Sequence, residues 1–495
     1  MSEQHDELPT NWAWTTLGGL GTWSGGGTPS KANKAFWTNG TIPWVSPKDM
    51  KSERIRTSED FITRTAVEQS SAKYIPADSV LMVTRSGILS HTFPVAVNDR
   101  EITVNQDLKA LSPFCGVQTD YIAWYLRTQN SRILAGCSKQ GTTVASIDTD
   151  RLKKYLVPIA PLNEQRRVVD RIDMLFAQLD KGEEALRAVQ KQLSRYRQSV
   201  LKAAVTGQLT ADWRAEKADR LEHGRDLLAH ILQARREIWD GRGRYKEPAA
   251  PETTDLPELP EGWVWASVEQ LANVMGGLTK NKKRQELPLR RPMLRVANVY
   301  QNRLELEDVH LAGVTEAECA RVMLEDLDLL VVEGNGSKDQ IGRMAVWRNE
   351  IPDAIHQNHL IKVRMIEKGL VEFALSWFQS PTGRQNIEKV ASSTSGLYTL
   401  SISKIEALVV PLPSLIEMEE IVARIDEALS KTSYLESWCQ TELARSAALR
   451  QSILKAAFSG RLVPQDPTDE PADVLLARIK AAKSSSASPK RRHSA

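Results

Sequence analysis

The chain of 495 residues lacks several patterns that mark enzymes and membrane proteins. Its four cysteines lie far apart without a Cys-x-x-Cys pair, which argues against a disulfide framework and a zinc cluster. It has no Gly-Lys dipeptide, so it has no phosphate-binding P-loop, and it has no Pro-Pro dipeptide, which excludes the Asn-Pro-Pro-Tyr type of methyltransferase motif. Its apolar runs are broken by charge long before membrane-spanning length. We therefore expect no membrane interaction and no familiar catalytic centre.

Two weaker patterns are better explained by structure than by chemistry. The stretch "GGLGTWSGGGTP" at 18–29 lacks the strand–GxGxxG–helix context of a nucleotide site, so we expect a loop or turn. His356 and His359 form an HxxH pair, but no nearby glutamate or cysteine completes a metal set. We expect no catalytic residue, no metal and no directly bound cofactor. The N-terminal "MSEQHDELPTNW" has no signal-peptide pattern, and with the sparse cysteines it favours a cytoplasmic location.

What the chain does contain is an internal duplication. The phrases that return at nearly one offset are "LPTNWAW" 8–14 as "LPEGWVW" 259–265, "VPIAPLNEQRRVVDRID" 157–173 as "VPLPSLIEMEEIVARID" 410–426, and "RQSVLKAAVTGQL" 197–209 as "RQSILKAAFSGRL" 450–462. We call the last pair the repeated phrase; nine of its thirteen positions are identical. Two copies of this size indicate a duplicated domain pair rather than a solenoid.

Each copy predicts a globular block followed by helices. In the blocks, short β-branched runs alternate with Gly/Pro/Asn turns and helical stretches such as "DYIAWYLRTQ" 120–129, which indicates a duplicated α/β (α+β) fold. We expect globular domains at 1–157 and 259–410, helical regions at 158–240 and 411–482, a linker at 241–258, and a disordered basic tail at 483–495.

The first helical region carries a heptad pattern. Two lines of positions seven apart are Val168, Leu175, Gly182, Val189, Tyr196 and Ile172, Leu179, Leu186, Leu193, Val200. The second region is interrupted at Thr432, Glu442 and Ser446. The residues that we expect at a helix-pairing or partner-binding surface are Val168, Ile172, Leu175, Leu179, Leu186, Leu193, Ile421, Ile425, Leu435 and Ile453. A long stripe of this kind needs a partner, and the other copy is the natural one; the alternative is two helices that each pack on their own domain.

Basic residues gather in one segment of the second block. These are Lys280, Lys282, Lys283, Arg284, Arg290, Arg291 and Arg295, with Glu286 as the one acid among them. Such a loop suits phosphate neutralisation or guanine readout, whereas the simpler interpretation is a solvated charged loop. The corresponding stretch 25–50 of the first block mixes lysines with Trp37 and Trp44, which we expect in the core. The candidate DNA contacts are Lys31, Lys34, Ser46, Lys48, Arg85, Ser86, Lys139, Gln140, Lys280, Lys282, Lys283, Arg284, Arg295, Asn298, Asn335 and Lys338.

The Gly-rich loop, "IPWVSPKDM", the Pro-rich exit with "LNEQRRVVDRID" and the repeated phrase, all within a duplicated plan, resemble the specificity (S) subunit of type I restriction-modification enzymes. The resemblance covers residue 8 to about 482. It implies two target-recognition domains separated by two long antiparallel helices with pseudo-two-fold symmetry. Each domain would read one half of an asymmetric bipartite site in double-stranded DNA. The helices would dock two methyltransferase (M) subunits and, through them, the restriction (R) subunits.

The same resemblance implies that S-adenosylmethionine, ATP and Mg²⁺ bind to the partner subunits. One departure lies in the second Pro-rich exit, where Glu417-Met418 stands in place of Glu164-Gln165. The alternative function is a protein–protein scaffold that keeps the helices without reading DNA. An enzyme with an unfamiliar active site is a third hypothesis, which the missing motifs disfavour.

Overall fold

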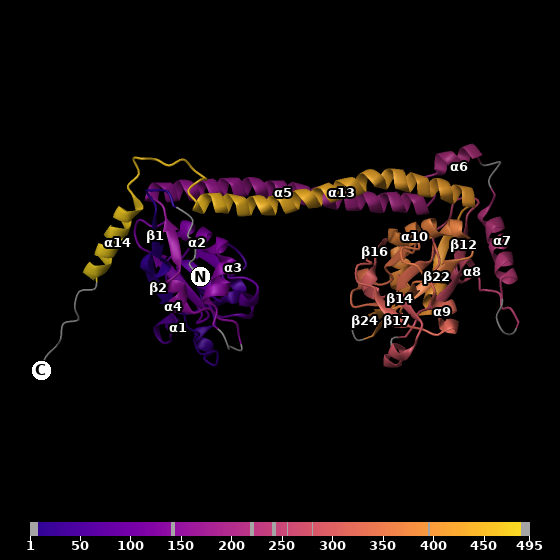
Figure 1. The fold of residues 1–495 in the computed structure, drawn as a ribbon, viewed down its shortest axis with the longest axis horizontal. Helices are drawn as coiled ribbons and strands as arrows, with labels where there is room; N and C mark the ends of the chain where they lie inside the picture. Colours follow the sequence, from indigo (N-terminus) through magenta and orange to yellow (C-terminus); the bar gives the residue numbers. More distant parts are fainter. Residues whose placement is uncertain are drawn as a thin grey trace. The chain divides into compact units, whose positions relative to one another are not determined.

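The computed structural model describes residues 8–139, 144–217, 222–239, 244–254, 256–279, 281–394 and 397–486. Within them no helix is long and apolar enough to cross a membrane. The chain divides into two compact units: unit 1 holds residues 1–186 and 440–495, and unit 2 holds residues 187–439. Each unit therefore contains one globular domain and one half of each long helix (Figure 1).

Unit 1 is built around two mixed sheets. Their strand orders are β2-β10-β7-β8-β4 and β5-β3-β9-β6, and a separate antiparallel pair joins β1 to β11. The strands are β1 Ala13–Thr16, β2 Gly21–Gly25, β3 Ile42–Val45, β4 Arg54–Ile55, β5 Asp60–Ile62, β6 Tyr74–Ile75, β7 Val80–Val83, β8 Val95–Asn98, β9 Ile102–Val104, β10 Leu108–Pro113 and β11 Leu156–Ile159. The domain's helices are α1 Arg64–Glu68, α2 Thr119–Thr128, α3 Asn130–Cys137 and α4 Thr149–Lys153.

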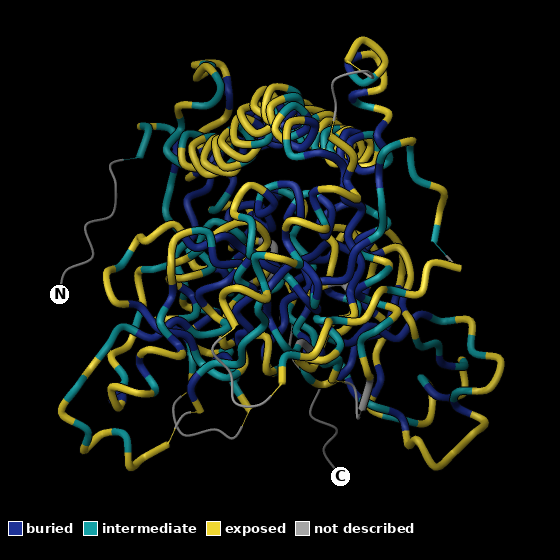
Figure 2. The backbone as a smooth tube through the Cα atoms, turned by 90° about the vertical axis from the view of Figure 1, so that its right-hand side faces the viewer, coloured by how far each residue is buried: buried dark blue, intermediate teal, exposed yellow. Residues whose placement is uncertain are grey.

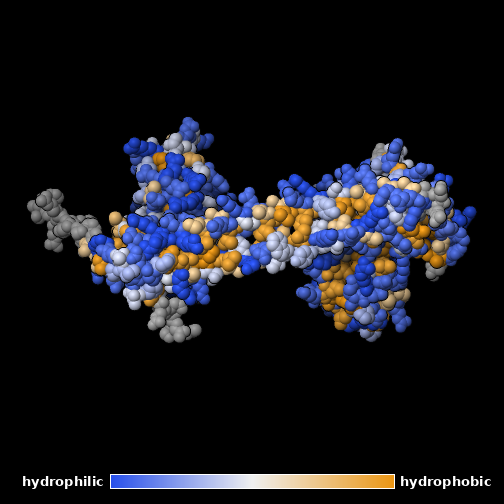
Figure 3. Space-filling model, turned by 90° about the horizontal axis from the view of Figure 1, so that it is seen from above, coloured by the Kyte–Doolittle hydropathy of each residue, from blue (hydrophilic) through white to orange (hydrophobic). Residues whose placement is uncertain are grey.

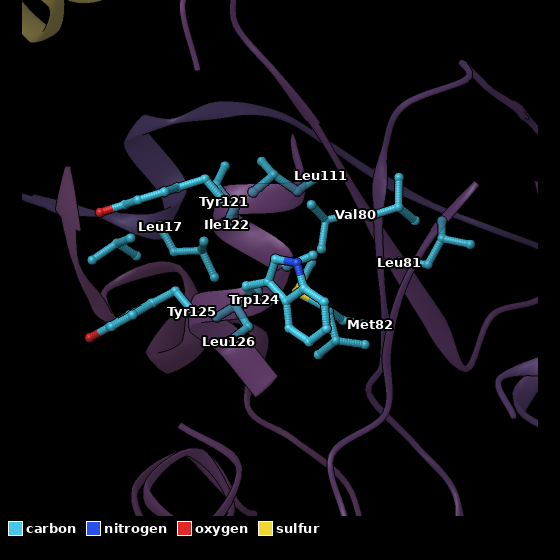
Figure 4. Close-up of a cluster of buried hydrophobic side chains, with 14 of the residues drawn as sticks. Leu17, Val80, Leu81, Met82, Leu111, Tyr121, Ile122, Trp124, Tyr125 and Leu126 are labelled. Carbon is cyan, nitrogen blue, oxygen red and sulfur yellow. The ribbon is translucent and has the colours of Figure 1, made fainter. Parts of the chain in front are cut away.

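The core of unit 1 forms around α2. This helix is apolar on every side over "YIAWYL", so it is buried along its middle rather than along one stripe. Its side chains meet Leu17 and the strand residues Val80, Leu81 and Leu111 (Figure 4). The glycine-rich stretch, which we expected to be a loop, instead supplies strand β2. The next glycine is required by close packing, since a Cβ at Gly26 would lie 1.8 Å from the carbonyl oxygen of Val104.

Unit 2 repeats the plan with more, shorter sheets. Their orders are β13-β22-β18-β20, β17-β14-β21, β19-β24-β23, β15-β16 and β12-β25. The strands are β12 Val264–Ser267, β13 Ala272–Gly276, β14 Arg290–Leu294, β15 Val299–Tyr300, β16 Arg303–Leu304, β17 His310–Gly313, β18 Leu329–Val332, β19 Gly334–Asn335, β20 Met344–Val346, β21 Ile355–His356, β22 Leu360–Met365, β23 Ser392–Thr394, β24 Leu397–Thr399 and β25 Val409–Leu412. The helices are α8 Val268–Leu271, α9 Glu316–Val322, α10 Val371–Gln379, α11 Pro381–Val390 and α12 Ile402–Glu406.

The two domains share one frame, which the repeated Trp-led phrase begins. In unit 1 Trp14 lies opposite Pro158 in the β1–β11 pair, and in unit 2 Trp265 lies opposite Pro411 in the β12–β25 pair. Strands such as β7 and β18 are buried over their whole length, whereas many loops are exposed (Figure 2). The matching register shows that the duplicated sequence produces a duplicated fold.

Two long helices and three shorter ones lie outside the domains. They are α5 Leu162–Val205, α13 Leu415–Phe458, α6 Ala211–Lys217, α7 Gly224–Glu237 and α14 Ala472–Ser486. The start of α5 pairs with the end of α13 in unit 1, where Arg450 binds Asp180 at 2.6 Å. The end of α5 pairs with the start of α13 in unit 2, where Leu201 and Ile425 share one core. The helices are thus antiparallel within each unit, and the alternative of two separately packed helices is wrong.

The surface along which α5 meets α13, which we call the helix seam, differs in part from the expected one. One line of seam residues on α5 is buried or half-buried, as expected: Ile172, Leu179, Leu186, Leu193 and Val200. The second line is Phe176, Glu183, Gln190, Arg197 and Ala204, while Gly182, Val189 and Tyr196 face outward. Val168 is buried against the domain and Leu175 is half-buried.

The second line of seam residues on α5 includes Glu183, Gln190 and Arg197, so a hydrophobic heptad pattern does not reveal it. Ser446 donates to Glu183 Oε1 at 2.7 Å, and Arg450 reaches the same oxygen, so the seam of unit 1 contains an ionic network. On α13 the small residues Thr432 and Ser446 are buried. Ile421 and Ile425 are buried and Ile453 is half-buried, whereas Leu435 is exposed and lies outside the seam.

The repeated phrase closes the domain of the other copy. Residues 450–462 belong to unit 1, where Phe458 lies 5.2 Å from the rings of both Tyr121 and Tyr125. Residues 197–209 belong to unit 2, where Leu201, Ala204 and Val205 enter the core. The phrase is therefore repeated first of all because two similar domains need the same helical lid.

This arrangement predicts a contrast between two leucines of α13 in unit 1. Leu454 is 7% exposed and Leu449 is 43% exposed. We expect Leu454→Ala to lower the free energy of unfolding by about 2–4 kcal/mol, because it leaves a cavity in the domain core. Leu449→Ala should change it by less than about 0.5 kcal/mol. Urea denaturation followed by tryptophan fluorescence measures both free energies of unfolding. Equal losses in the two variants would contradict the packing of residues 450–462 in the core of unit 1.

Candidate nucleic-acid interface

In unit 1 the polar side chains of the turn after β3 bind to one another and to nearby acids. Both the amide and the hydroxyl of Ser46 donate to Asp49 Oδ2, at 2.8 and 2.9 Å. Lys48 Nζ lies 2.9 Å from Asp60 and 3.0 Å from Glu59. The hydrogen bonds to Asp60 and Glu59 raise the pKa of Lys48 to about 12, so the cation is permanent. Ser46 therefore shapes the turn, and Lys48 presents a charge that two acids already balance.

A hollow of about 710 Å³ lies beside this turn, lined by residues 48, 49 and 51–59. It holds cations that sequence reasoning missed. Arg54 binds Asp99 at 3.0 Å and Asp120 at 2.6 Å, while Arg56 binds the second oxygen of Asp99. Lys51 is mostly exposed at its rim. The density of basic residues in "KDMKSERIR" was the one signal in the sequence that could have indicated this site.

Three candidates, the neighbours Arg85 and Ser86 and the distant Lys139, meet on one short segment of unit 1. Arg85 forms an isolated β-bridge with Ser146. The amide of Ser86 donates to the carbonyl of Ala145 at 3.1 Å, and the amide of Lys139 donates to Ser146 at 2.8 Å. Their side chains thus come from one side of the domain. Lys31 and Lys34 are exposed on another loop, and Gln140 lies outside the described residues.

In unit 2 the basic segment is less free than its sequence indicates. Lys282 and Lys283 are exposed on the short 3₁₀ helix Lys282–Glu286, whose start is capped by Asn281. Arg284 is held by Glu318 through two hydrogen bonds of 3.0 and 2.9 Å. These bonds are the main reason that the pKa of Glu318 falls to about 2. Lys280 lies outside the described residues.

Acids from other segments also hold two further arginines of this cluster. Arg295 binds Asp308 at 2.8 Å, and Arg291 lies 3.5 Å from Asp353. Asn298 is buried; it accepts from the amide of Arg295 and donates to the carbonyl of Glu305, both at 2.8 Å. Asn298 and Arg284 thus have structural roles in the free protein. Their contact with DNA stays a prediction.

The last two candidates lie near β19. Asn335 belongs to that strand, and its side chain lies outside what the structure describes. Lys338 Nζ lies 3.3 Å from Glu388 and its side chain is exposed. In Figure 1, β14, β17 and β24 lie on the side of their domain away from α13. The exposed lysines therefore stand on a surface that the helices leave open.

The HxxH pair has structural partners. His356 is buried, and burial lowers its pKa to about 4, so the ring is neutral. Its Nδ1 lies 3.0 Å from the carbonyl oxygen of Val322, while His359 contacts Glu333. Among the residues that the structure describes, no group of three His, Cys, Asp or Glu could hold a metal ion. Trp44 is buried and packs edge-to-face on Trp37 at 5.2 Å, as expected for core residues.

Comparisons with known proteins agree on one family. Residues 9–188 match the family model of the type I restriction modification DNA specificity domain. The specificity subunit of EcoKI from Escherichia coli strain K12 is 25% identical over 98% of either chain. That of EcoR124I/EcoR124II from Escherichia coli is 43% identical, over 37% of this chain and 46% of the relative. A structure titled as the basis of assembly and conformational transition of the type I R-M system aligns with a TM-score of 0.61 at 16% identity, covering 92% of this chain and 100% of that one.

The Arg284–Glu318 pair makes a pH-dependent prediction. A lowered carboxylate pKa contributes stability that is present above the ordinary value of 4.5 and is lost as the pH falls toward 2. We expect Arg284→Ala to destabilise the chain by about 1–2 kcal/mol at pH 7. The difference from wild type should narrow between pH 4.5 and 3. Arg290→Ala, which removes an exposed cation, is the control, and denaturant titrations at several pH values measure both. A constant difference down to pH 3 would contradict the assignment.

Proposed function

The chain belongs to the specificity subunits of type I restriction-modification enzymes, which recognise the DNA target and are not themselves catalytic, and we propose that it binds an asymmetric, bipartite DNA site. The supporting observation is that the two domains share one strand arrangement but have different exposed loops. Trp14–Pro158 and Trp265–Pro411 occupy the same register, so the domains are built alike. Their exposed basic loops have unrelated sequences. Two domains with the same fold and different loops are suited to binding two different half-sites.

Each domain offers phosphate and base contacts of its own. In unit 1 these are the exposed lysines Lys31 and Lys34 and the group of Arg85, Ser86 and Lys139. In unit 2 they are Lys282 and Lys283. Lysines position a protein on the backbone, while Arg, Ser and amide side chains read base edges in the major groove. The scaffold alternative needs none of these exposed cations and is not favoured.

We also propose that the long helices bind two methyltransferase subunits and, through them, restriction subunits. Apolar side chains gather along the helices on the face seen from above in Figure 3. Tyr196 in unit 2 is 50% exposed and corresponds in the duplication to Leu449 in unit 1. One exposed apolar residue in each unit, directly before the repeated phrase, suits two copies of one partner. S-adenosylmethionine, ATP and Mg²⁺ would then bind to those partners.

Exchange of one domain tests the bipartite proposal. We expect replacement of residues 8–157 by the corresponding domain of another family member to change one half-site only, because the other domain keeps its own loops. Mapping of methylated adenines in cells that carry the exchanged chain and its methyltransferase measures the result. A change in both half-sites, or in neither, would refute independent reading.

Salt dependence tests the lysines of unit 2. Each phosphate contact that is lost should reduce the slope of log K against log[salt] by about 0.9. We expect Lys282→Ala and Lys283→Ala each to weaken binding of duplex DNA by the methyltransferase complex and to flatten its slope. Lys368→Ala removes an exposed charge beside α10 and should leave the slope unchanged. An unchanged slope in all three variants would show that the two lysines are merely solvated.

Partner docking is tested by stoichiometry. We expect Tyr196→Glu and Leu449→Glu each to remove one of two methyltransferase subunits from the complex, since a charge on either apolar site opposes burial. The double variant should remove both. Leu311→Glu, at an exposed position of β17, is the control. Multi-angle light scattering of the purified complexes measures their mass, and a full complement of subunits in the double variant would refute this docking surface.

A further inference from the structure

Unit 2 contains a hollow that its counterpart in unit 1 does not leave open. It lies between α10 and the paired ends of α5 and α13 and has a volume of about 360 Å³. Its lining includes Arg197, Ser376, Gln379, Asp426, Leu429 and Ser433. All of them belong to one unit, so the hollow is a feature of that unit alone.

The matching place in unit 1 can be located through equivalent contacts. Tyr125 on α2 donates its hydroxyl to the carbonyl of Leu156 at 3.1 Å, and Trp377 on α10 donates its indole N–H to the carbonyl of Val409 at 2.6 Å. Leu156 and Val409 stand at the same point of the two frames, since each is the strand residue paired last in its ladder. Trp377 therefore corresponds to Tyr125, and the residue before it, Ser376, corresponds to Trp124.

An indole fills that place in unit 1. Trp124 Nε1 donates to Asp173 Oδ1 at 3.3 Å, and its ring lies 5.0 Å from the ring of Phe176. The guanidinium of Arg450 lies 4.9 Å above the same Phe176 ring. The indole thus lies beside a carboxylate and edge-to-face with Phe176, and the guanidinium of Arg127 covers it at 4.5 Å from the ring centroid.

Unit 2 keeps the carboxylate and one arginine but loses volume, and it also loses the guanidinium of Arg127, whose place on α10 is taken by Gln379. Asp426 corresponds to Asp173, and Arg197 corresponds to Arg450. In contrast, Ser376 replaces the indole of Trp124 and Leu429 replaces Phe176. Each of these exchanges removes bulk, so the hollow follows from the sequence.

A hydrogen-bond donor in this hollow is also unsatisfied. Gln379 is 8% exposed, and its Nε2 has no hydrogen-bond partner among the residues that the structure describes. A buried donor without an acceptor costs free energy that a bound acceptor would recover. Gln379 lines the hollow with a donor that the described residues leave unmatched, and a rotation of its side chain would bring that buried donor to a bound ring.

We propose that this hollow binds a small planar N-heteroaromatic molecule of the benzimidazole or purine-base type. The ring would take the place of the Trp124 indole and lie beside Leu429 and Arg197, as that indole lies beside Phe176. A ring N–H would donate to Asp426, as Trp124 does to Asp173, and a ring nitrogen would accept from Gln379. Asp426 and Glu372 line the hollow together with Arg197, and Glu372 is paired with Arg348, so the site offers an anion no excess of positive charge. The ligand is therefore an uncharged base rather than a nucleotide. This inference does not depend on DNA recognition.

Calorimetric titration of the full chain with benzimidazole and adenine tests the site. For ligands of this size we expect one site with Kd on the order of 1 mM or tighter. Ser376→Trp, which restores the side chain of unit 1, should abolish binding, and Gln379→Leu should weaken it roughly tenfold. Indole offers an N–H but no ring acceptor, so it should bind wild type no better than benzimidazole binds the Gln379→Leu variant.

The reverse substitution, made at Trp124, tests the proposal in unit 1. Trp124→Ser should create a second site and raise the stoichiometry from one to two in the folded protein, which circular dichroism verifies. If that variant does not fold, Ser376→Trp and Gln379→Leu decide the question by themselves. The proposal is overturned if wild type shows no saturable binding up to the solubility limit of the probes. It is also overturned if Ser376→Trp binds as well as wild type.

Discussion

A buried carboxylate at the start of α13 joins three separate parts of the chain. Glu417 accepts from the hydroxyl of Thr210 at 2.8 Å, from Nε of Arg214 at 2.9 Å and from the indole of Trp263 at 2.9 Å. Thr210 and Arg214 lie just after the end of α5, at the start of and within α6, whereas Trp263 begins the second domain. A buried charge is tolerated only when it is paired and hydrogen-bonded, so these segments must meet for unit 2 to be stable. The lid formed by the repeated phrase depends on this meeting point.

In unit 1 the residue equivalent to Glu417 is Glu164, and other groups hold the corresponding segments together. Glu164 accepts from Gln465 at 2.5 Å, and burial raises its pKa although this hydrogen bond and the charge of Arg167 act in the opposite direction. The charge that ties this unit together is instead Asp469, which binds Arg167 at 2.7 Å. The two copies thus keep one architecture while exchanging the groups that hold it. This freedom is what allows the same frame to carry different surfaces.

The surfaces differ in how their charges are balanced. In unit 1 the cations around the hollow are matched by Asp99 and Asp120, and in unit 2 those of the basic segment by Glu318 and Asp308. A loop whose arginines are already fixed can hold neighbouring lysines in place without reorganisation on binding. Lys282 and Lys283 are therefore exposed beside an arginine that Glu318 already holds in place.

The duplication and the long helices follow from the sequence alone, because identical phrases and heptad spacing are local properties of a sequence. The assignment of Ile172 and Leu179 to the seam also follows from that spacing. The second seam line could not be found this way, because Glu183 and Arg197 are polar and face inward only when α13 supplies partners or space. Tertiary structure alone decided which arginines are held by acids from distant segments, that each repeated phrase serves the other copy's domain, and that Ser376 leaves open the space which Trp124 fills. Each of these outcomes depends on residues far apart in the chain, whose proximity no local pattern records.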